Sequence, residues 1–555
     1  MEPSTIQYAL DLAVQHHQAG RLHEAEKIYR QILAQQPGNA GVLLNLGVIA
    51  GQMGRNDVAV ELIGRVIALN PNFAEAHFNL GVALKEPSQV ERAIVAFQRA
   101  VALKPNYVQA HYFLGNARKD KGEFDQAIAA YQKAIALGPN HADAHNNLGI
   151  ALKDKGRIDE AIAAFQRAIA IRADFAGAHY NLGIVLKDAG QLDGAIVAYH
   201  TSIALNPNKA EVHGNLGNAL KEKGEFEAAV EAYRRATILD PNLVEAHYNF
   251  ALVLLLHGEW EQGWPEYEWR WKLREFQLSQ REFSQPIWDG SDLNGRTILL
   301  HAEQGFGDAI QFMRYVPLVA GRGGRVIVEV RPQLLRLMRG LAGVEEWISS
   351  GEPIPAFDVR CSLMSLPHRF GTTLQTIPGQ EPLRVDLDLV QTWQRRLGSK
   401  SSGLKIGLAW AGSPTFKGDR TRSMSLDRLE PLSQVGGVTF YSIQKGAAAA
   451  AQAEQPPSGL QLVNLSPDLQ DFADTAAVMS AMDLVITTDT SVAHLAGALG
   501  RPVWVMLQFV PDWRWLLDRQ DCPWYPTMRL FRQNSPGDWA GVIASVVREL
   551  GEYSA

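Results

Sequence analysis

The hydrophobic positions in the first half of the chain recur with a period of 34 residues. A Leu-Gly pair, a later alanine, an aromatic residue and a proline return at this interval, and the apolar residues between them keep the spacing of amphipathic helices. The pattern predicts seven helix pairs from about residue 6 and a last helix from about residue 244. Each pair must stack on its neighbours to bury its apolar face, so we expect an α-solenoid. The prolines that mark the period are Pro37, Pro71, Pro105, Pro139, Pro207 and Pro241, with Ala173 in the one missing place.

From about residue 296 the pattern changes to short apolar runs that alternate with helical stretches. A polar, glycine-containing break at 390–403 divides this part into two blocks. Such alternation predicts two doubly wound α/β lobes, with ligands at the carboxyl ends of the strands in a cleft between them. Helices are expected from about Ala309, over Pro332–Gly340, near Asp471–Ser480 and from Thr490. Strands are expected at Thr297–His301, Val326–Val330, near Trp347, and at Lys405–Trp410, Val438–Ile443, Leu484–Thr488 and Val503–Leu507.

The two patterns divide the chain into four parts. Residues 257–276 begin as another repeat but contain four tryptophans and a proline, which indicates a capping helix pair that docks the array on the α/β part of the chain. The last helix, near Trp539–Leu550, is expected to pack back on the first lobe. The expected parts are a repeat superhelix over 1–272, a linker over 273–295, a first lobe over 296–395 and a second lobe over 396–555.

Composition narrows the class of protein without indicating a function. Of 555 residues, 46% are hydrophobic and 20% are charged, and the net charge of −6 gives no nucleic-acid footprint. The cysteines, Cys361 and Cys522, lack metal-ligand spacing and suit a reducing compartment. The sequence shows no basic, apolar leader after Met1 and no apolar stretch of 18 residues. We therefore expect a cytoplasmic protein with no transmembrane segment and no nucleic-acid partner.

Two polar rows accompany the repeats, and the first is a row of histidines. The histidines lie three and four residues before the Leu-Gly pairs, or before Phe250-Ala251 in the case of His247, on the helix stripe that packs inside the hairpin. A packed histidine in the place of a bulky aromatic explains this row better than a metal site does. The residues are His77, His111, His145, His179, His213 and His247.

The second row consists of asparagines two residues after the histidine positions, hence on a different helix face. An acidic residue follows seven positions later, nearly on the same face as the asparagine. A carboxamide both donates and accepts, so a ladder of them can pair with the backbone of any extended peptide; a solvated polar face is the alternative. We predict an acceptor-peptide groove formed by Asn45, Asn79, Asn147, Asn181, Asn215 and Asn249, interrupted by Phe113, and by Asp120, Asp154 and Asp188.

The loop after the first expected strand contains Gly305, Gly307 and Asp308. Strand, glycine-rich turn and helix together imitate a dinucleotide-binding fingerprint, but Ile310 stands where a third glycine is required, so we expect no dinucleotide. Asp308 opens the helix. It is either a helix cap or a general base that points into the cleft.

Cations and hydroxyls follow strands of the second block. The loop after residue 410 carries three cations suited to phosphate oxygens, with a solvated basic loop as the alternative. Asp489, Thr490 and Ser491 begin a helix, where free backbone N–H groups and the helix dipole favour an anion, and His494 follows one turn later. We interpret Asp386-Leu387-Asp388, a D-x-D sequence, as chance and predict no metal. The cationic and nucleotide-binding candidates are Lys417, Arg420 and Arg422, then Gln444 and Lys445.

These motifs resemble known families. The 34-residue unit resembles the tetratricopeptide repeat. The stretch "GFGDAIQFMRYVPLV", residues 305–319, resembles the early Gly-Asp motif of bacterial heptosyltransferases, and "DTSVAHLAGALGRPV", residues 489–503, resembles their nucleotide-sugar motif. A tetratricopeptide array joined to two lobes of GT-B architecture is similar to O-GlcNAc transferase.

The resemblance implies a glycosyltransferase that moves a sugar from a nucleotide diphosphate sugar to an acceptor. A protein Ser/Thr hydroxyl recruited by the repeats is the first acceptor to consider, and a glycan or lipid-linked sugar is the alternative. An alternative of another class is an interaction scaffold with an inactive sugar-nucleotide domain. GT-B enzymes generally need no metal, because protein cations and a helix dipole stabilise the leaving diphosphate. No cofactor is implied beyond the donor, for which UDP-GlcNAc is the first guess.

The resemblance also implies roles for single residues. Asp308 matches the proposed base of heptosyltransferases. Where O-GlcNAc transferase has a histidine in this loop, the chain has Asp308 and Ala309, so the identity of the base stays open. The expected diphosphate ligands are Lys417, Arg420, Thr490 and Ser491, and the expected nucleoside ligands are Gln444, Lys445 and His494.

Overall fold

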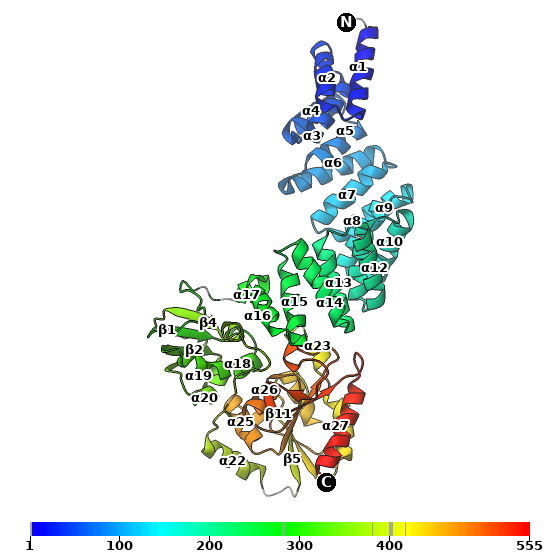
Figure 1. Ribbon diagram of the computed structural model, residues 1–555. Coiled ribbons are helices and arrows are strands. Elements are labelled where there is room, and N and C mark those ends of the chain that lie inside the picture. The colour runs from blue at the N-terminus through cyan, green and yellow to red at the C-terminus, as the bar shows by residue number, and fades with distance from the viewer. Residues whose placement is uncertain are drawn as a thin grey trace. The chain divides into compact units, whose positions relative to one another are not determined.

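A computed structural model describes residues 3–279, 281, 283–379, 381–398, 403–416 and 418–554. The chain forms two compact units, with the boundary between Ala219 and Leu220. The first unit is a helical array, and the second contains the last helices of the array and two α/β lobes (Figure 1). No helix of the described residues is long and apolar enough to cross a membrane.

The first unit consists of helix pairs with the predicted 34-residue period. Short turns join the helices, and successive pairs stack on one another. The helices are α1 Pro3–Gln18, α2 Leu22–Gln35, α3 Ala40–Gln52, α4 Asn56–Leu69, α5 Ala74–Ala83, α6 Val90–Leu103, α7 Val108–Asp120, α8 Phe124–Leu137, α9 Ala142–Asp154, α10 Ile158–Ile171, α11 Ala176–Asp188, α12 Leu192–Leu205 and α13 Ala210–Lys223, which crosses the boundary.

The glycine of each Leu-Gly pair allows the two helices of a repeat to pack closely. A Cβ built on any of five of these glycines would lie 2.5–2.8 Å from a side chain of the second helix. The glycine on the first helix and the large residue on the second helix therefore pack directly against each other. The pairs are Gly47 with Ile63, Gly81 with Phe97, Gly115 with Tyr131, Gly149 with Phe165 and Gly183 with Tyr199.

The row of histidines fixes each helix pair to the turn before it. In each of the six units that carry it, the histidine Nε2 donates to a backbone carbonyl six residues earlier, at 2.9–3.2 Å. The carbonyl belongs to the marker proline, or to Ala173 where that proline is missing. This bond explains why histidine and proline share one period, and it adds a polar anchor to the packing role that the sequence predicted.

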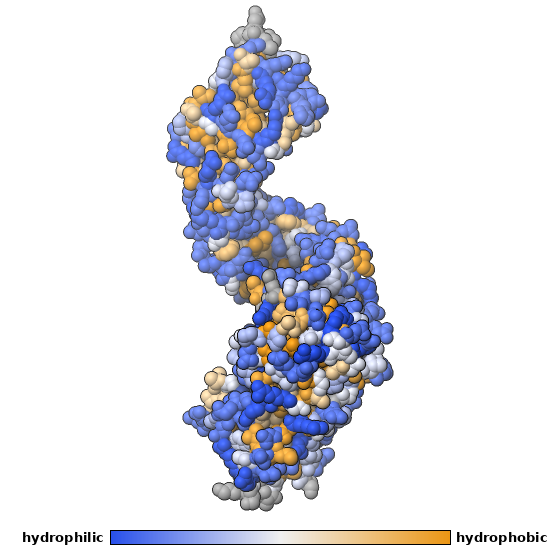
Figure 2. Space-filling view, turned by 90° about the vertical axis from the view of Figure 1, so that its left-hand side faces the viewer, coloured by the Kyte–Doolittle hydropathy of each residue, from blue (hydrophilic) through white to orange (hydrophobic). Residues whose placement is uncertain are grey.

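One repeat departs from the pattern at Pro87. Helix α5 ends at Ala83, because proline has no N–H to donate and holds Glu86 in an extended conformation. Phe113, which interrupts the asparagine row in the next repeat, packs against Phe78 with ring centroids 5.5 Å apart. A mainly apolar groove of about 540 Å³ follows α4, α5 and α6 here. Figure 2 shows hydrophobic residues at the surface of the repeats nearest the N-terminus.

The second unit begins with the last helices of the array, which contact both lobes. Trp260 stacks on Trp524 with ring centroids 5.1 Å apart, and the Trp264 indole donates to the Thr372 carbonyl at 2.8 Å. These contacts agree with the predicted docking role of residues 257–276. The helices are α14 Phe226–Leu239, α15 Val244–His257, α16 Trp260–Tyr267, the 3-10 helix η2 Glu268–Lys272 and α17 Arg274–Ser279.

The first lobe contains a parallel sheet of four strands in the order β3-β2-β1-β4, as far as the described residues show. Strand β4 has no counterpart in the predicted pattern. The elements are β1 Thr297–His301, α18 Phe306–Phe312, η3 Met313–Tyr315, α19 Val316–Ala320, β2 Arg325–Val330, α20 Pro332–Met338, β3 Glu346–Ser349, β4 Val359–Ser362, η4 Leu363–Ser365, α21 Leu366–Arg369 and α22 Leu387–Leu397.

The second lobe contains a sheet of seven described strands in the order β10-β11-β9-β8-β5-β6-β7, and only β10 runs antiparallel. Its elements are β5 Leu404–Ala409, α23 Asp419–Arg422, η5 Leu426–Gln434, β6 Val438–Ser442, α24 Ala447–Ala451, η6 Gln452–Glu454, β7 Leu462–Asn464, η7 Ser466–Asp468, α25 Phe472–Ser480, β8 Leu484–Thr488, α26 Ser491–Ala498, β9 Val503–Leu507, η8 Trp513–Trp515, β10 Asp521–Cys522, β11 Tyr525–Arg532 and α27 Trp539–Ser554.

Two expectations about the lobes need correction. The last helix, α27, packs on the second lobe itself, where Trp539 and Val546 join the core formed by β5, β8 and β9; it was expected on the first lobe. The reason is its apolar stripe, which covers one face of the second sheet. The polar break expected at 390–403 is occupied up to Leu397 by the amphipathic helix α22.

Candidate active site

Each sheet has a switch point, where the chain crosses from one side of a central strand to the other. In the first lobe the chain passes from β1 to β2 and β3, and then returns to β4 on the opposite side of β1. In the second lobe β5 stands between β6 and β8 in the same way. The loops that follow β1 and β4, and those that follow β5 and β8, therefore diverge at these points. Ligands of doubly wound sheets bind there.

Asp308 lies in the first turn of α18, the helix that follows the loop after β1. Its Oδ2 accepts from the Gly305 N–H at 2.7 Å, which satisfies a backbone donor at the helix start. Its Oδ1 accepts from Arg514 Nη2 at 2.5 Å. The helix-capping role considered from sequence is therefore present, and it uses one oxygen of the carboxylate, whereas an ion pair to the second lobe uses the other.

Gly307 provides the contact between the two motif helices, α18 and α26. A Cβ on Gly307 would lie 2.6 Å from His494 Cδ2. The His494 side chain is buried; its Nδ1 lies 3.2 Å from the Tyr525 hydroxyl, and its ring stacks on Trp515. Burial, with the charges of Arg514, Arg314 and Arg422, holds the pKa of His494 far below its usual value. His494 thus packs as a neutral imidazole between the lobes.

Thr490 is the N-cap of α26, at the carboxyl end of β8. Its hydroxyl accepts from the Val492 N–H at 3.3 Å and lies 3.3 Å from the Thr487 hydroxyl. Ser491 is the first residue of the helix and is half-buried. The stretch therefore presents two hydroxyls at a helix N-terminus, where backbone N–H groups and the helix dipole favour an anion.

Asp489 precedes this N-cap and was not among the predicted site residues. Its carboxyl is buried, and burial together with the Asp512 carboxylate raises its pKa to about 6, although Arg422 and Arg514 act in the opposite direction. A carboxyl that titrates near neutral pH, at the carboxyl end of a central strand, is the kind of group that active sites contain. Its position between an apolar strand and the Thr-Ser pair was a usable sequence signal.

The basic loop after β5 and the start of α26 lie at the same edge of the sheet, because β5 pairs in parallel with β8. The charge of Arg422 lowers the pKa values of both Asp489 and His494. Arg422 also contacts Asp419 at 3.3 Å and stacks on Phe416. Arg420 is exposed. The predicted phosphate ligand Lys417 lies outside the described residues.

Gln444 and Lys445 follow β6 and hold backbone groups. Gln444 Oε1 accepts from the N–H groups of Trp410 and Ala411 at 2.8 and 3.0 Å, which fixes the end of β5. Lys445 Nζ donates to the carbonyls of Ser466 and Leu469 at 3.1 and 2.7 Å. Both side chains are therefore engaged by the fold, and their expected contact with a nucleoside stays a prediction.

Arg514 connects the two lobes and was not predicted. It is buried in the segment between β9 and β10, where it donates to Asp308, to Asp512 at 2.7 Å and to Gln311 at 2.8 Å. These carboxylates outweigh the effect of burial and raise the pKa of Arg514. Arg514 stands between Trp513 and Trp515, and this Trp-Arg-Trp sequence was the only local sign of its role.

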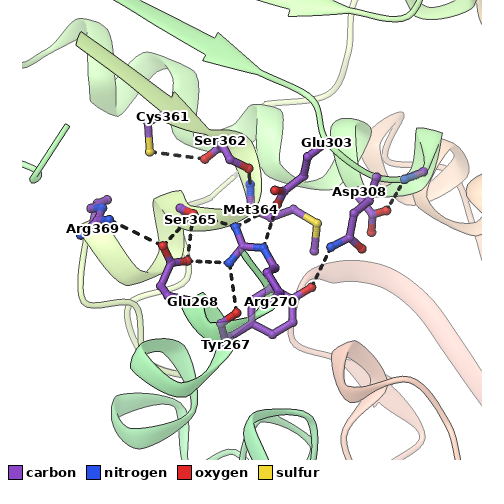
Figure 3. A network of polar contacts seen from close by, with 12 residues as sticks. Tyr267, Glu268, Arg270, Glu303, Asp308, Cys361, Ser362, Met364, Ser365 and Arg369 are labelled. Carbon is purple, nitrogen blue, oxygen red and sulfur yellow. Dashed lines mark hydrogen bonds and ion pairs between the residues drawn. The ribbon is translucent and has the colours of Figure 1, made fainter. Parts of the chain in front are cut away.

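Arg270 occupies the switch point of the first lobe and was also missed. Figure 3 shows its guanidinium between Glu303, which follows β1, and Ser365, which follows β4. Glu268 accepts from the same guanidinium at 2.6 Å. The D-x-D residue Asp386, by contrast, caps helix α22, and no group of three or more potential metal ligands occurs among the described residues.

The asparagine row forms hydrogen bonds along the array. Asn45 and Asn215 donate to the hydroxyls of Tyr29 and Tyr180 at 3.3 and 2.9 Å, and Asn181 donates to Asn146 at 3.0 Å. All six ladder asparagines are half-buried. Asn79 and Asn249 donate instead to carbonyls of their own helices. The acidic residues Asp120, Asp154 and Asp188 are exposed, each beside a lysine at 3.3–3.5 Å.

The fold and the site therefore define an α-solenoid joined to an α/β pair of the kind found in GT-B glycosyltransferases. Models of tetratricopeptide repeats match residues 16–81, 74–107 and, in four overlapping copies, 115–258. The model of glycosyltransferase family 9 (heptosyltransferase) matches residues 430–506. These matches show tetratricopeptide repeats followed by a segment that matches glycosyltransferase family 9.

One curated protein and several crystal structures are similar to parts of this chain. The chain is similar to Protein FlbA of Caulobacter vibrioides, with 27% identity over 330 residues, 53% of each protein, so it spans about half the length of this relative. Similar crystal structures include YrrB, a TPR protein with an unusual peptide-binding site, at 24% identity over 34% of this chain and 96% of YrrB, with a TM-score of 0.31. Another is MamA, at 33% identity over 30% of this chain and 96% of MamA, with a TM-score of 0.28.

Proposed function

We propose that this chain transfers a sugar from a nucleotide diphosphate sugar to a protein hydroxyl. One observation carries the proposal: the hydroxyls of Thr490 and Ser491 follow β8, and the basic loop with Arg422 follows the neighbouring parallel strand β5, so both groups lie at the same edge of the second sheet. The segment that matches glycosyltransferase family 9 includes this helix start. Hydroxyls, free N–H groups and a cation together suit a diphosphate.

In the proposed donor complex, Thr490, Ser491 and the N–H groups of α26 hold the diphosphate. Arg420 and Arg422 neutralise its charge. Lys417 is proposed as a further phosphate ligand because of its position in the sequence. Because these cations and the helix dipole stabilise the leaving diphosphate, the reaction as proposed requires no metal. UDP-GlcNAc is the first donor to test.

In the proposed reaction, the acceptor hydroxyl oxygen forms a bond to the anomeric carbon while the bond from that carbon to the diphosphate oxygen breaks. Asp308 takes the proton of the hydroxyl. To do so, its Oδ1 must exchange the hydrogen bond from Arg514 for one from the acceptor, while its Oδ2 stays on the Gly305 N–H. Arg514 keeps Asp512 and Gln311 as partners during this exchange.

The repeat array is proposed to bind the acceptor protein. The hydrogen bonds of Asn45, Asn181 and Asn215 use the amide nitrogen, and no acceptor bond to their amide oxygens is found among the described residues. Those oxygens are suited to accept from the backbone N–H groups of an extended peptide. A glycan acceptor is the second candidate, because the matched family is described by its heptosyltransferases.

A panel of UDP-, ADP- and GDP-sugars tests the proposal. Full-length protein is incubated with each donor, with and without a protein extract, and released nucleoside diphosphate is measured. We expect release with at least one donor and stimulation by protein. A triple change to alanine at Asn45, Asn181 and Asn215 should remove the stimulation but leave donor hydrolysis unchanged.

The matched control changes three exposed turn asparagines, Asn106, Asn140 and Asn208, to alanine and should keep the stimulation. Stimulation by glycans that does not depend on the ladder would favour the second candidate. If none of the donors releases a nucleoside diphosphate, the interaction scaffold would be the function that the results favour.

A further inference from the structure

The switch point of the first lobe is filled by a side chain from the end of the repeat array. Arg270 is 0% exposed and lies where a doubly wound sheet usually binds a ligand. The residues around it come from three places: Glu268 from η2, Glu303 from the loop after β1, and Ser365 from η4 after β4 (Figure 3). The position is therefore used for contacts within the protein.

All five N–H donors of the Arg270 guanidinium have partners. Nε and Nη2 donate to Glu303 Oε1 at 3.1 and 2.9 Å, and Nη2 also donates to Ser365 Oγ at 2.7 Å. Nη1 donates to Glu268 Oε1 at 2.6 Å and to the Tyr267 carbonyl at 3.2 Å. A lysine has three donors on one nitrogen and could not span these groups, so the site requires the planar fork of arginine.

The segment that contains Tyr267 and Arg270 also fixes two successive residues of the loop that leads to Asp308. Arg270 fixes Glu303, and the Tyr267 hydroxyl accepts from Gln304 Nε2 at 3.1 Å. Gly305 follows directly, and its N–H donates to Asp308. The path from the repeat array to the Asp308 carboxylate is therefore a short chain of direct contacts.

The charge of Arg270 is needed to keep Glu303 in place. The Glu303 side chain is 6% exposed, and its Oε2 has no hydrogen-bond partner among the described residues. Burial raises the pKa of Glu303, and the charge of Arg270 opposes this effect. Without Arg270 the carboxyl would be buried without a counter-charge, so it would take up a proton or move towards solvent. Either change releases the start of the loop.

We propose that Arg270 is a positioning residue: together with Tyr267, it fixes residues 303–307 and thereby the orientation of Asp308. The segment at the end of the repeat array thus contributes to the structure of the first lobe. The effect on catalysis rests on the proposed glycosyl transfer, whereas the fixing of the loop does not. An experiment can therefore contradict one of these two claims without contradicting the other.

The test compares Arg270→Met, Arg270→Lys and Tyr267→Phe with Arg369→Gln in the full-length protein. Arg369 is the matched control, because it contacts Glu268 at 3.6 Å in the same network, and this contact does not involve the loop. Hydrogen exchange is measured on peptides that cover 302–312, and kcat and KM are measured with the donor found active.

For Arg270→Met we expect at least tenfold faster exchange in the loop and a fall in kcat of about 100-fold, because a small displacement of a reacting group has effects of this size. The donor KM should stay within about threefold, since the donor groups lie in the other lobe. Arg270→Lys should recover only part of kcat, and Tyr267→Phe, which removes one hydroxyl, should lower kcat by a smaller factor. Arg369→Gln should change neither loop exchange nor kcat.

A second variant separates positioning from stability. In Arg270→Met with Glu303→Leu the buried carboxyl is gone, so the thermal midpoint should rise above that of Arg270→Met alone while kcat stays low. Recovery of kcat together with the midpoint would overturn the proposal, as would loop exchange equal to wild type in both Arg270→Met and Tyr267→Phe. If wild type transfers no sugar, the proposed function fails, and the exchange measurements still decide whether Arg270 fixes the loop.

Discussion

The Asp308 carboxylate and the Arg514 guanidinium form a hydrogen-bonded ion pair of 2.5 Å between the two lobes, although the two residues are 206 positions apart in the sequence. Both groups are more than four-fifths buried, at 19% and 7% exposure of their side chains. The pair joins the motif that follows β1 to the segment that follows β9. Asp308 therefore has a structural and a proposed catalytic role, and variants must distinguish the two.

Asp308→Asn keeps the size of the side chain and an oxygen for the Gly305 N–H but loses the charge. We expect transfer to fall by about 10²–10⁴-fold, as for the loss of a general base, and donor binding to change by less than threefold. The thermal midpoint should fall moderately, since Arg514 keeps Asp512. The control is Arg336→Gln, which breaks another ion pair between the lobes, to Asp471, and should leave transfer within twofold. Full activity of Asp308→Asn would remove Asp308 as the base.

The stability of the second unit should depend on the protonation of Asp489. Its pKa is raised to about 6 from a usual value of 3.8, so the folded protein binds this proton more tightly than the unfolded chain does. The stabilising effect is complete below about pH 4 and is lost as the pH rises to about 6. At pH 7 Asp489→Asn should therefore be more stable than wild type by up to about 3 kcal/mol, and this gain should vanish towards pH 4.

Denaturant unfolding from pH 4 to pH 7 measures this difference. Asp388→Asn, a change at an exposed aspartate on α22, provides the control and should give a difference from wild type that varies little with pH. A difference between wild type and Asp489→Asn that stays constant over the range would mean that Asp489 does not titrate as its environment indicates.

The two hydroxyls at the start of α26 should behave differently. Thr490→Ala removes the N-cap, so it should cost about 1 kcal/mol of stability and also weaken donor binding. Ser491→Ala leaves the cap intact, so it should weaken donor binding with little effect on stability. Thermal unfolding and nucleotide titration of both variants check this. Equal destabilisation by both changes, with unchanged binding, would make the stretch a structural cap only.

Gly307 should tolerate no larger side chain, because a Cβ would lie 2.6 Å from the buried His494 ring. Gly307→Ala is expected to cost about 1–3 kcal/mol, as overpacked cores do. Gly436→Ala is the control, since no atom lies within 4 Å of its Cβ position, and should change stability by less than about 0.5 kcal/mol. Thermal unfolding of the two variants measures the difference. Similar midpoints for both would show that His494 can move away at little cost.

Local sequence patterns predicted the period of the repeats, and they predicted the limits of several strands of the lobes to the residue. β1, β8 and β9 are short apolar runs bounded by polar or glycine residues, so their limits are clear. Strands β4 and β11 were missed, because Arg360 interrupts the first and Pro526 with Arg529 interrupts the second. These strands are stabilised by pairing with β1 and β9, which a single segment does not reveal.

Sequence patterns indicated the parts of the candidate site in which a motif is contiguous, and they gave no sign of the parts that come together only in the fold. Thr490 and Ser491 could be found because strand, cap and helix are contiguous. Arg270 and Arg514 could not, since the partners that join them to the loop after β1 and to α18, Glu303 and Asp308, lie 33 and 206 residues away. An isolated arginine also gives no sign of burial. The histidine row shows a third case, in which the period was visible but the bond to the proline carbonyl required the turn geometry.

The central claim, that the start of α26 binds the diphosphate of a sugar donor, is tested most directly by calorimetric titration of full-length protein with UDP, ADP and GDP. We predict micromolar binding of at least one of them, weakened at least tenfold by Ser491→Ala combined with Arg422→Gln and unchanged by Asp388→Asn. Binding of no nucleoside diphosphate, or binding that the double change leaves intact, would contradict the account.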